Sequence, residues 1–408
     1  MIPLPDLLSR VYGRAPRGIE LGLDRVGRAL DALDHPERNW ASLHIAGTNG
    51  KGSVAAIASL ALQQAGYRVG LFTSPHLHRF AERIRIDQIP LDDDRLAQAL
   101  ALALSFDLTF FETAFIAAII AFHQAKTECA VFEVGLGGRL DATNVIEKPV
   151  ATAVTRIALD HGSVLGYSLE TIAFEKASIA KPGCPMVIGP MPEPARLRVQ
   201  QVACERGANP VVFANHTPWA QAPLHPRLAG HHQHDNATVA AALCFHATTA
   251  LNRLTLTHLQ RAVATVTWPG RLESLAFRGI EVLLDGAHNP DAIDALVAHV
   301  NRRHLEPNRV ALVFGAMQDK AWKTMLTILQ PIARHRFFVE PHGRQPAALP
   351  ELQATLEGKA CASASQAIEI ASQIVGPTGL IVVCGSLFLV AETRSWLLQE
   401  PSDPMVAL

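Results

Sequence analysis

The sequence lacks the features that mark secreted, disulfide-linked and zinc-stabilised proteins. Its six cysteines include no CxxC pair. Cys129 and Cys384 lie inside apolar runs, where thiols pack as small hydrophobic groups. The opening residues, MIPLPDLLSR, contain no basic segment followed by a long apolar run, so we expect no signal peptide. We therefore expect a cytoplasmic protein without a disulfide framework or a structural zinc site.

An excess of one charge and a membrane-length apolar run are also missing. The chain has 36 Lys and Arg against 37 Asp and Glu, so it has no overall field that would attract nucleic acid or an anionic membrane. The longest apolar run, Ala114 to Phe122, is too short to span a bilayer and indicates a buried helix. No GxSxG motif supplies a serine nucleophile. Any phosphate binding must therefore come from a local site.

Short apolar runs alternate with longer helix-like stretches along the whole chain. Runs such as SLHIAG, AVFEVG, EVLLDGAH and GLIVVCGS are rich in Val, Ile and Leu and lack strict polar alternation. This rhythm predicts an α/β fold with mostly parallel sheets that are covered on both faces. The rhythm breaks near residues 267–271 and restarts at Ile280. We therefore predict a large N-terminal domain, residues 1–277, and a smaller Rossmann-like C-terminal domain, residues 278–408.

A glycine-rich loop, GTNGKGS at residues 47–53, stands between a strand-like run and a helix-like run. Glycines allow backbone N–H groups to surround phosphate oxygens, and a helix N-terminus adds positive potential. Lys51 is placed to reach the outer phosphates, and Ser53 lies near phosphate or Mg²⁺. The spacing differs from strict GxxxxGK[ST] because Gly52 separates Lys51 from Ser53. The combination nevertheless favours a P-loop for ATP over a structural glycine turn.

A histidine-rich stretch, residues 231–234 (HHQH), has the composition of a metal-binding tract. It lacks the cysteine or regularly spaced histidine partners of a zinc site. We therefore do not predict a metal site there.

Further motifs follow the loop in order and cover nearly the whole chain. They are TSPHL (73–77), EVGLGGRLDATN (133–144), LDH (159–161), FEKA (174–177), PGRLE (269–273), DGAHNP (285–290), FGAMQDK (314–320) and VCGS (383–386). Together with GTNGKGS, this series resembles the dihydrofolate synthase/folylpolyglutamate synthase family of Mur-ligase-like enzymes. The resemblance implies that ATP phosphorylates a substrate carboxylate and that the amine of L-glutamate then attacks the acyl phosphate.

The resemblance also implies the residues of the site. Catalytic roles fall to Lys51, His161 and Lys176, the last as a candidate carboxylated lysine. Magnesium, in two sites, would be held by Ser74, Glu133 and His161. ATP would be bound by Asn49, Gly50, Lys51, Gly52, Ser53, Asn236, Arg271, Asp285 and His288. The pteroate substrate would be held by Ile19, Glu20, Leu21, Thr109, Phe110, Phe111, Glu112, Leu140, Asp141 and Ala142.

Simpler interpretations exist for the metal and lysine positions. Glu133 ends a strand-like run beside the phosphate loop, which suits Mg²⁺, but a solvated strand-end acid has the same pattern. Imidazole is an unusual Mg²⁺ ligand, so chemistry alone would make His161 a core or base histidine. The pattern around Lys176 favours a solvated helix face, and its carboxylation requires a neutral amine with a lowered pKa.

The remaining candidates have structural alternatives as well. Ser74 and Asn236 could cap helices, Arg271 could form a linker ion pair, and Asp285 could be a strand-end acid. The rings of Phe110–Phe111 could stack on a pterin or pack in the core. The chain also departs from the family pattern at Ser178, where Gly is common, and at Ala321, where Asp is common.

We predict that the enzyme adds L-glutamate both to dihydropteroate and to reduced folates. The alternatives are folylpolyglutamate synthesis alone, a Mur-type ligase that acts on UDP-muramyl peptides, and a nucleotide-binding regulator without catalysis. The Mur-type ligase is disfavoured because the chain lacks an obvious UDP-binding domain at its N-terminus. The regulator is disfavoured because the chain combines Lys51, Ser53, Glu133, His161 and Lys176. We expect a monomer with small-molecule substrates and no nucleic-acid or membrane partner.

Overall fold

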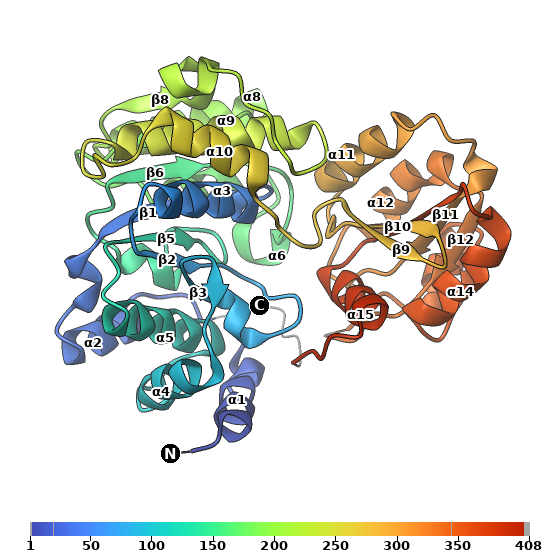
Figure 1. The fold of residues 1–408 in the computed structure, drawn as a ribbon, viewed down its shortest axis with the longest axis horizontal. Helices are drawn as coiled ribbons and strands as arrows, with labels where there is room; N and C mark the ends of the chain where they lie inside the picture. The colour runs from blue at the N-terminus through green and yellow to red at the C-terminus, as the bar shows by residue number, and fades with distance from the viewer. Residues whose placement is uncertain (1, 19, 344, 404–408) are drawn as a thin grey trace.

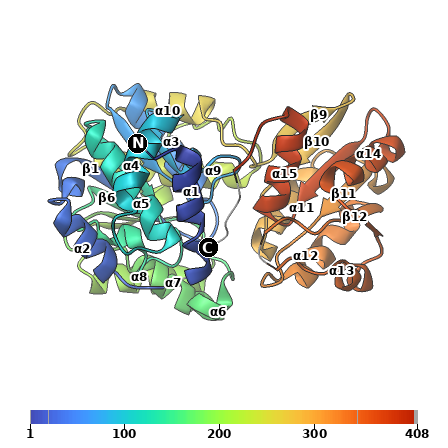
Figure 2. The ribbon, with the colours of Figure 1, turned by 90° about the horizontal axis from the view of Figure 1, so that it is seen from below.

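The computed structural model describes residues 2–18, 20–343 and 345–403 (Figure 1). Two α/β domains stand side by side, and the views in Figures 1 and 2 both separate them. Each domain contains its own sheet, of eight strands in the first and six in the second. The predicted α/β fold, with a smaller Rossmann-like second domain, is confirmed.

The first sheet has the order β4-β3-β2-β5-β1-β6-β7-β8. Strands from β2 to β8 across the sheet pair in parallel, while β3 and β4 form an antiparallel edge. Most of these strands are buried, as expected for a sheet covered by helices on both faces. The strand bounds are β1 Ala41–Ala46, β2 Val69–Phe72, β3 Ile84–Ile86, β4 Ile89–Pro90, β5 Cys129–Glu133, β6 Ala151–Val154, β7 Met186–Ile188 and β8 Val211–Phe213.

Helices cover both faces of the first sheet. One face carries α3, α9 and α10, which pack on one another in a common core cluster (Figure 1). On the other face, α1, α4 and α5 cover β2 and β3, and α7 and α8 cover β6 and β7. The helix bounds are α1 Leu4–Tyr12, α2 Asp24–Ala32, α3 Lys51–Gln64, α4 Asp93–Ala103, α5 Phe110–Gln124, α6 Gly162–Leu165, α7 Leu169–Ala177, α8 Glu193–Glu205, α9 His232–Ala247 and α10 Leu256–Thr265.

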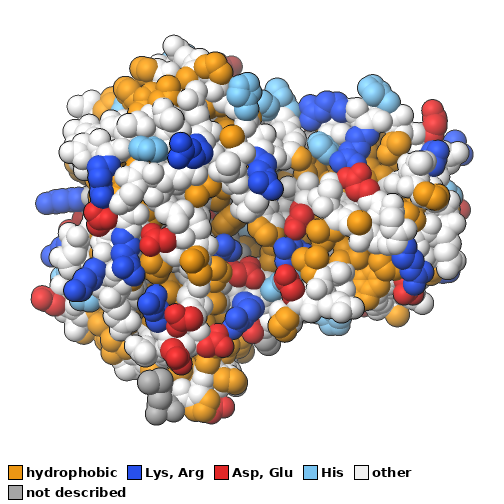
Figure 3. All heavy atoms as spheres, viewed as in Figure 1, with side chains coloured by type: hydrophobic (Ala, Val, Ile, Leu, Met, Phe, Trp, Pro, Cys, Tyr) orange, Lys and Arg blue, Asp and Glu red, His pale blue; other side chains and the backbone are white. Residues whose placement is uncertain are grey.

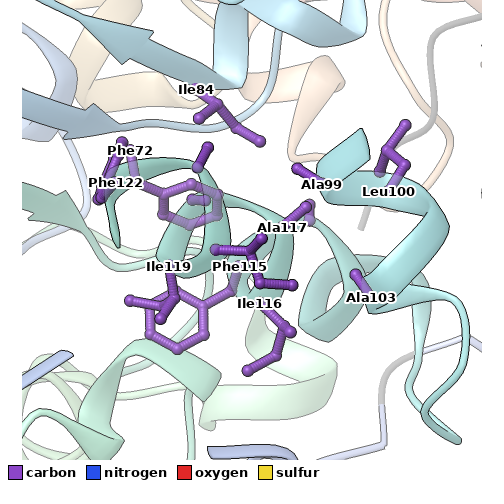
Figure 4. Close-up of a cluster of buried hydrophobic side chains, with 14 of the residues drawn as sticks. Phe72, Ile84, Ala99, Leu100, Ala103, Phe115, Ile116, Ala117, Ile119 and Phe122 are labelled. Atoms are coloured by element: carbon purple, nitrogen blue, oxygen red, sulfur yellow. The ribbon is translucent and has the colours of Figure 1, made fainter. Parts of the chain in front are cut away.

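The apolar run predicted to be a buried helix is α5, which lies in the core beneath β2 and β5. Figure 4 shows this cluster, with Phe115 of α5 beside Phe72 of β2 and Ile84 of β3. The ring of Phe115 lies 5.7 Å from that of Phe72 and 5.8 Å from that of Phe132, centroid to centroid. This helix is apolar on all sides because its neighbours surround it.

The second sheet has the order β13-β12-β11-β14-β10-β9 and is parallel except for β9. Helices α11, α12 and α13 share a core on one face, and α14 and α15 cover the other. The bounds are β9 Glu273–Phe277, β10 Ile280–Leu284, α11 Pro290–Asn301, β11 Val310–Phe314, α12 Trp322–Leu329, β12 His335–Phe338, α13 Leu349–Thr355, β13 Lys359–Ala360, α14 Ala364–Val375, β14 Leu380–Cys384 and α15 Leu387–Leu398.

Strand β9 changes the position of the domain boundary. It pairs with β10 in the second sheet, although it precedes residue 278, where the sequence places the start of the second domain. The turn between the two strands contains Arg278 and Gly279, both at positive φ, as in the type I′ turns that favour tight hairpins. The predicted boundary therefore falls inside a hairpin, and we propose a boundary in the linker at residues 266–272 instead.

A second connection between the domains comes from the segment after α15. The carboxylate of Glu400 lies 2.8 Å from Nδ1 of His78 in the first domain. The backbone N–H of Asp403 donates to the carbonyl of His78 at 2.6 Å, and its carboxylate accepts from Phe80 N at 2.8 Å. This segment therefore contacts the loop that carries Ser74. In the described ranges, no helix combines the length and apolar character needed to cross a membrane.

Candidate active site

A cavity of about 490 Å³ lies at the junction of the two domains. Figure 3 shows the hollow between them, with acidic and basic side chains inside it. The carboxyl ends of strands in both sheets face this cavity, which is where open α/β sheets bind ligands. Its lining includes all the residues predicted for catalysis, ATP and metal: Asn49, Gly50, Lys51, Gly52, Ser53, Ser74, Glu133, His161, Lys176, Asn236, Arg271, Asp285 and His288.

The phosphate loop connects β1 to α3 in a conformation that requires glycine. Gly47 and Gly50 have φ values of +148° and +92°. A Cβ on Gly50 would lie 2.2 Å from Oδ1 of Asn236, so there is no room for a side chain. The Thr155 hydroxyl donates to the carbonyl of Asn49 at 2.7 Å and holds the loop from the neighbouring strand. The first N–H groups of α3 therefore remain available for an anion.

Lys51 is the first residue of α3, and its side chain contacts the backbone of the phosphate loop. Its Nζ donates to the carbonyls of Gly47 and Thr48 at 3.1 and 3.2 Å. Burial lowers the pKa of Lys51, while the carboxylates of Glu133 and Asp160 act in the opposite direction. The lysine is thus held in position before any phosphate is bound.

Glu133 ends β5, Ser74 follows the adjacent strand β2, and the two residues meet at the cavity wall. Oε2 of Glu133 accepts a hydrogen bond from the backbone N–H of Ser74 at 3.1 Å. Burial raises the pKa of Glu133, and the nearby Lys51 opposes this shift. Across the described ranges, no three His, Cys, Asp or Glu side chains lie close enough to hold a metal ion by themselves. The pair fits Mg²⁺, which prefers oxygen ligands and usually takes one or two from protein and the rest from phosphate and water.

His161 lies on the β6–α6 segment in a left-handed conformation, with φ of 51°. Burial lowers its pKa to about 3, with the nearby cation Lys320 acting in the same direction. The imidazole is therefore neutral at physiological pH, as a metal ligand must be. Its Nε2 lies 3.4 Å from Nζ of Lys320, which reaches across from the second domain.

Asp160 also lines the cavity, although the sequence did not predict it as a site residue. It accepts from Lys320 Nζ at 2.6 Å and from Asn289 Nδ2 at 3.2 Å, and His288 Nε2 lies 3.4 Å away. Although burial acts to raise it, the hydrogen bond with His288 and the charges of neighbouring groups hold the pKa of Asp160 well below its usual range. The available signal was that Asp160 and Lys320 both belong to motifs of the series, LDH and FGAMQDK.

A second ion pair crosses the same junction. Arg156 of the first domain contacts both oxygens of Asp291 with its Nε, each at 2.8 Å. Asp291 also accepts from Asn49 Nδ2 at 2.9 Å. The phosphate loop is therefore tied directly to the start of α11 in the second domain.

Lys176 lies at the end of α7 and is only 4 % exposed, so it is not on a solvated helix face. Burial lowers its pKa to about 7, and the positive charge of Lys51 acts in the same direction. About half of the Lys176 amines are therefore neutral near pH 7. A neutral amine is the form that reacts with CO₂, so the site supplies the condition that carboxylation requires.

The remaining residues predicted for ATP lie in α9 of the first domain, in the linker and after β10 of the second domain. Asn236 lies within α9 rather than at its cap, and its Nδ2 donates to Gln233 Oε1 at 2.9 Å. The Asp285 carboxylate accepts from Leu272 N at 2.8 Å and from Ala287 N at 2.9 Å, so it fixes the linker against β10. Arg271 makes no hydrogen bond or ion pair with the rest of the described chain, and its guanidinium is therefore available to an anion in the cavity.

The residues predicted for pteroate form a separate group. In the part of the chain that the structure describes, none of them lines the junction cavity. Ile19 lies outside the described residues, while Leu21 is exposed and Leu140 half-buried. Glu20 forms ion pairs with Arg17 and Arg25.

Thr109, Phe110, Phe111 and Glu112 open helix α5. Thr109 and Glu112 form a reciprocal capping box, and Glu112 also binds Arg25 at 2.9 Å. Phe110 stacks on Tyr12 at 5.8 Å, and Phe111 lies 5.7 Å from Phe72. Both rings belong to the core cluster, in agreement with the alternative that they pack in the core. Their proposed contact with pterin stays a prediction.

Asp141 and Ala142 lie at the start of the short 3₁₀ helix η4 (Ala142–Val145), and both are buried. The carboxylate of Asp141 accepts from Leu136 N at 2.9 Å and from the Thr143 hydroxyl at 2.6 Å. Leu136 itself lines the junction cavity. The pteroate group is thus connected to the cavity through the loop that precedes Asp141.

Comparison with known proteins places this geometry in context. The family model "Mur ligase, glutamate ligase domain" matches residues 270–387. The dihydrofolate synthase/folylpolyglutamate synthase of Bacillus subtilis is 32% identical, over 96% of this chain and 98% of that protein. The structure of Escherichia coli FolC with DHPP and ADP has a TM-score of 0.86 at 29% identity, over 98% of each chain. A bifunctional folylpolyglutamate synthase/dihydrofolate synthase with Mn, AMPPNP and L-glutamate has a TM-score of 0.86 at 30% identity, again over 98% of each chain.

The glycine at position 50 provides a test of the loop geometry. We expect Gly50→Ala to destabilise the first domain by about 2–4 kcal/mol, because it adds a side-chain clash to the strain of positive φ. Gly66→Ala is the matched control, since Gly66 also has positive φ but a methyl group there would have nothing within 4 Å. That control should lose only about 1 kcal/mol. Urea denaturation measures both, and equal losses would contradict the clash with Asn236.

The pKa of Lys176 predicts a pH dependence of stability. Because this pKa is lowered to about 7 in the folded protein, the unfolded chain binds more protons between about pH 7 and 10. The free energy of unfolding should therefore rise with pH through this window, and the full cost of burying the ammonium is present below pH 7. Lys176→Met removes that cost.

In CO₂-free buffer, Lys176→Met should therefore stabilise the protein by a few kcal/mol at pH 6 and by much less at pH 10. Urea denaturation at the two pH values measures the difference. Lys323→Met, at an exposed lysine of α12, is the control and should show no such pH-dependent gain. A gain from Lys176→Met that is the same at both pH values would rule out the shifted pKa.

Proposed function

Since this chain belongs to the dihydrofolate synthase/folylpolyglutamate synthase family, we propose that it couples L-glutamate to dihydropteroate and to the glutamate tail of reduced folates, using ATP. The observation that carries the proposal is the junction cavity, which gathers every residue predicted for ATP, metal and catalysis. The cofactors proposed are ATP and Mg²⁺. Solved relatives contain ADP, AMPPNP, Mn and L-glutamate, which supports this choice.

ATP has a natural place between the phosphate loop and the second domain. Backbone N–H groups at the start of α3, with Lys51, would hold the β- and γ-phosphates. Arg271 enters the cavity from the linker with a planar guanidinium, which suits a phosphate or carboxylate oxygen. Asn236, Asp285 and His288 would complete the nucleotide contacts.

The reaction needs positioning rather than a protein nucleophile. An oxygen of the folate carboxylate attacks the γ-phosphorus, the bond to the β-phosphate oxygen breaks, and ADP leaves. The amine of glutamate then attacks the acyl carbon, phosphate departs and the amine gives up a proton. Each step gains from reactants held close together and from positive charge placed where negative charge develops. The cavity lies between the two domains, and a closer approach of the domains would protect an acyl phosphate from water.

Ser74 and Glu133 would hold one magnesium ion, and neutral His161 would contribute to a second. Bound Mg²⁺ supplies charge neutralisation for the phosphate oxygens. Lys176 would join this arrangement as a carbamate, which replaces a buried cation with a carboxylate. The lowered pKa of Lys176 and its place in the cavity lining support that assignment.

The pteroate segment lies next to the cavity. A Cβ on Gly135, which lines the cavity, would lie 2.4 Å from the ring of Phe111, so ring and loop are in close contact. Asp141 holds the backbone of Leu136 in the same loop. We therefore keep the predicted pteroate residues as the holding site for the ring end of the substrate, with its carboxylate directed into the cavity.

A cytoplasmic monomer without nucleic-acid or membrane partners completes the proposal. All six cysteines are free, which is in keeping with a reducing compartment. Tail extension alone remains the second candidate function, because one of the relatives, from Lacticaseibacillus casei, is named only a folylpolyglutamate synthase.

The decisive measurement is phosphate release by the purified protein with Mg-ATP and L-glutamate, and with dihydropteroate or tetrahydrofolate added separately. We expect release only when acceptor and glutamate are both present, and mass spectrometry should show one added glutamate on each acceptor. Release with tetrahydrofolate alone would reduce the function to tail extension. If folded protein releases no phosphate with either acceptor, the folate assignment is rejected.

Glu133→Gln should reduce this activity by about 100-fold or more, because the amide cannot supply the charge that draws a metal ion to the phosphates. Glu128→Gln is the matched control, since Glu128 adjoins the opposite end of β5 and is exposed. It should leave the activity unchanged. Equal activity in both variants would remove Glu133 from the metal site.

Carboxylation of Lys176 can be observed directly. The neutral Nζ attacks the carbon of CO₂, an N–C bond forms, and one proton passes to solvent. Protein equilibrated with ¹³C-bicarbonate should show a carbamate carbon resonance that is absent from Lys176→Met and retained in Lys323→Met. A spectrum without this resonance at pH 8, where the amine is mostly neutral, would show that Lys176 acts as a free amine.

A further inference from the structure

Asn289 joins the second domain to the phosphate loop of the first. Its Oδ1 accepts from Ala292 N at 3.0 Å, which caps helix α11, and also from Asn49 Nδ2 at 3.1 Å. Its Nδ2 donates to Asn49 Oδ1 at 3.0 Å and to Asp160 Oδ2 at 3.2 Å. Asn289 is buried, so water does not compete for these contacts. One side-chain amide thus serves a helix start, the phosphate loop and the β6–α6 segment.

The side chain of Asn49 depends on contacts with the second domain, whereas its main chain does not. Its main chain is held from within the first domain, by the hydroxyl of Thr155 and by a bridge to Arg156. Its side-chain hydrogen bonds within the described chain all go to Asn289 and Asp291 in the second domain. If the domains separate, the Asn49 side chain therefore loses every one of these partners, while the loop keeps its backbone support.

We propose that Asn289 is a positioning residue that couples closure of the two domains to the shape of the phosphate loop through its paired amide contact with Asn49. A loop shaped by closure binds nucleotide better in the closed state, and nucleotide must then favour closure to the same extent. The inference rests on the proposed function only in taking a nucleotide as the ligand of the loop. Asn289 would thus contribute to nucleotide binding in addition to capping helix α11.

Asn289→Asp separates this role from helix capping. Aspartate caps a helix as well as asparagine does, so α11 should keep its start. The change removes both Nδ2 hydrogen bonds and places a carboxylate against Asp160 and against Oδ1 of Asn49. Ser363→Asp is the matched control, because Ser363 caps α14 in the same domain and lies outside the cavity lining.

A rescue variant tests the contact itself. In the double variant Asn289→Asp/Asp160→Asn, the donor and acceptor are exchanged between the two positions, and the repulsion between carboxylates disappears. Because Asp160→Asn also breaks the ion pair with Lys320, the double variant is compared with Asp160→Asn alone, and Asn289→Asp should open the domains less in that background than in the wild type. Such an interaction between two substitutions is the signature of direct coupling.

Two measurements on the full chain decide the proposal: the radius of gyration of the ligand-free protein from X-ray scattering, and the Kd for ADP from calorimetry. Asn289→Asp should raise the radius of gyration and weaken ADP binding by about tenfold, within the usual range of coupling between sites. Ser363→Asp should match the wild type in both. A thermal unfolding midpoint close to that of Ser363→Asp shows that the fold is intact.

Wild-type values of both quantities in Asn289→Asp would overturn the proposal. Weakened ADP binding with an unchanged radius of gyration would overturn it too, because Asn289 would then act on the nucleotide without acting on closure. If the wild-type protein does not bind ADP, the proposed function fails, and scattering alone still decides whether Asn289 holds the domains together.

Discussion

The buried ion pair between Asp160 and Lys320 is the interaction on which the junction depends. Each side chain is almost completely buried, 7 % and 10 % exposed, and each comes from a different domain. Loss of one partner would leave the other as an unpaired buried charge, at a cost of several kcal/mol, so the closed junction requires both groups. His288 and Asn289 converge on the same carboxylate, and the cavity is built around this cluster.

The cavity concentrates charges that water would otherwise screen. Lys51, Glu133 and Lys176 all have pKa values shifted toward the neutral form, with burial as the largest cause. These shifts mean that burial disfavours the charged forms of these groups when no substrate is bound. Phosphate, metal and carboxylate ligands would restore the missing counter-charges, which is how such a site favours a highly charged transition state.

The two domains contribute different things to this site. The first supplies the phosphate loop, whose backbone is held by the hydroxyl of Thr155, together with the ends of β2 and β5 that lead to Ser74 and Glu133. The second supplies side chains that reach across, chiefly Lys320 and Asn289. A ligase that must exclude water from an acyl phosphate benefits from this division, because its site is complete only when the domains meet.

The sequence by itself determined the α/β class, the phosphate loop and the family, because these depend on local apolar rhythm and on short motifs whose spacing survives in one dimension. It also predicted residues for metal and ATP, and the fold gathers these residues in one cavity. Only the tertiary structure decided the contacts between residues far apart in the chain. Strand β9 joined the second sheet through a hairpin that the boundary prediction had divided, and Phe110 lay in the core against Tyr12. The burial that shifts the pKa of Lys176, and the pairing of Asp160 with Lys320, likewise arise from three-dimensional packing that no local pattern encodes.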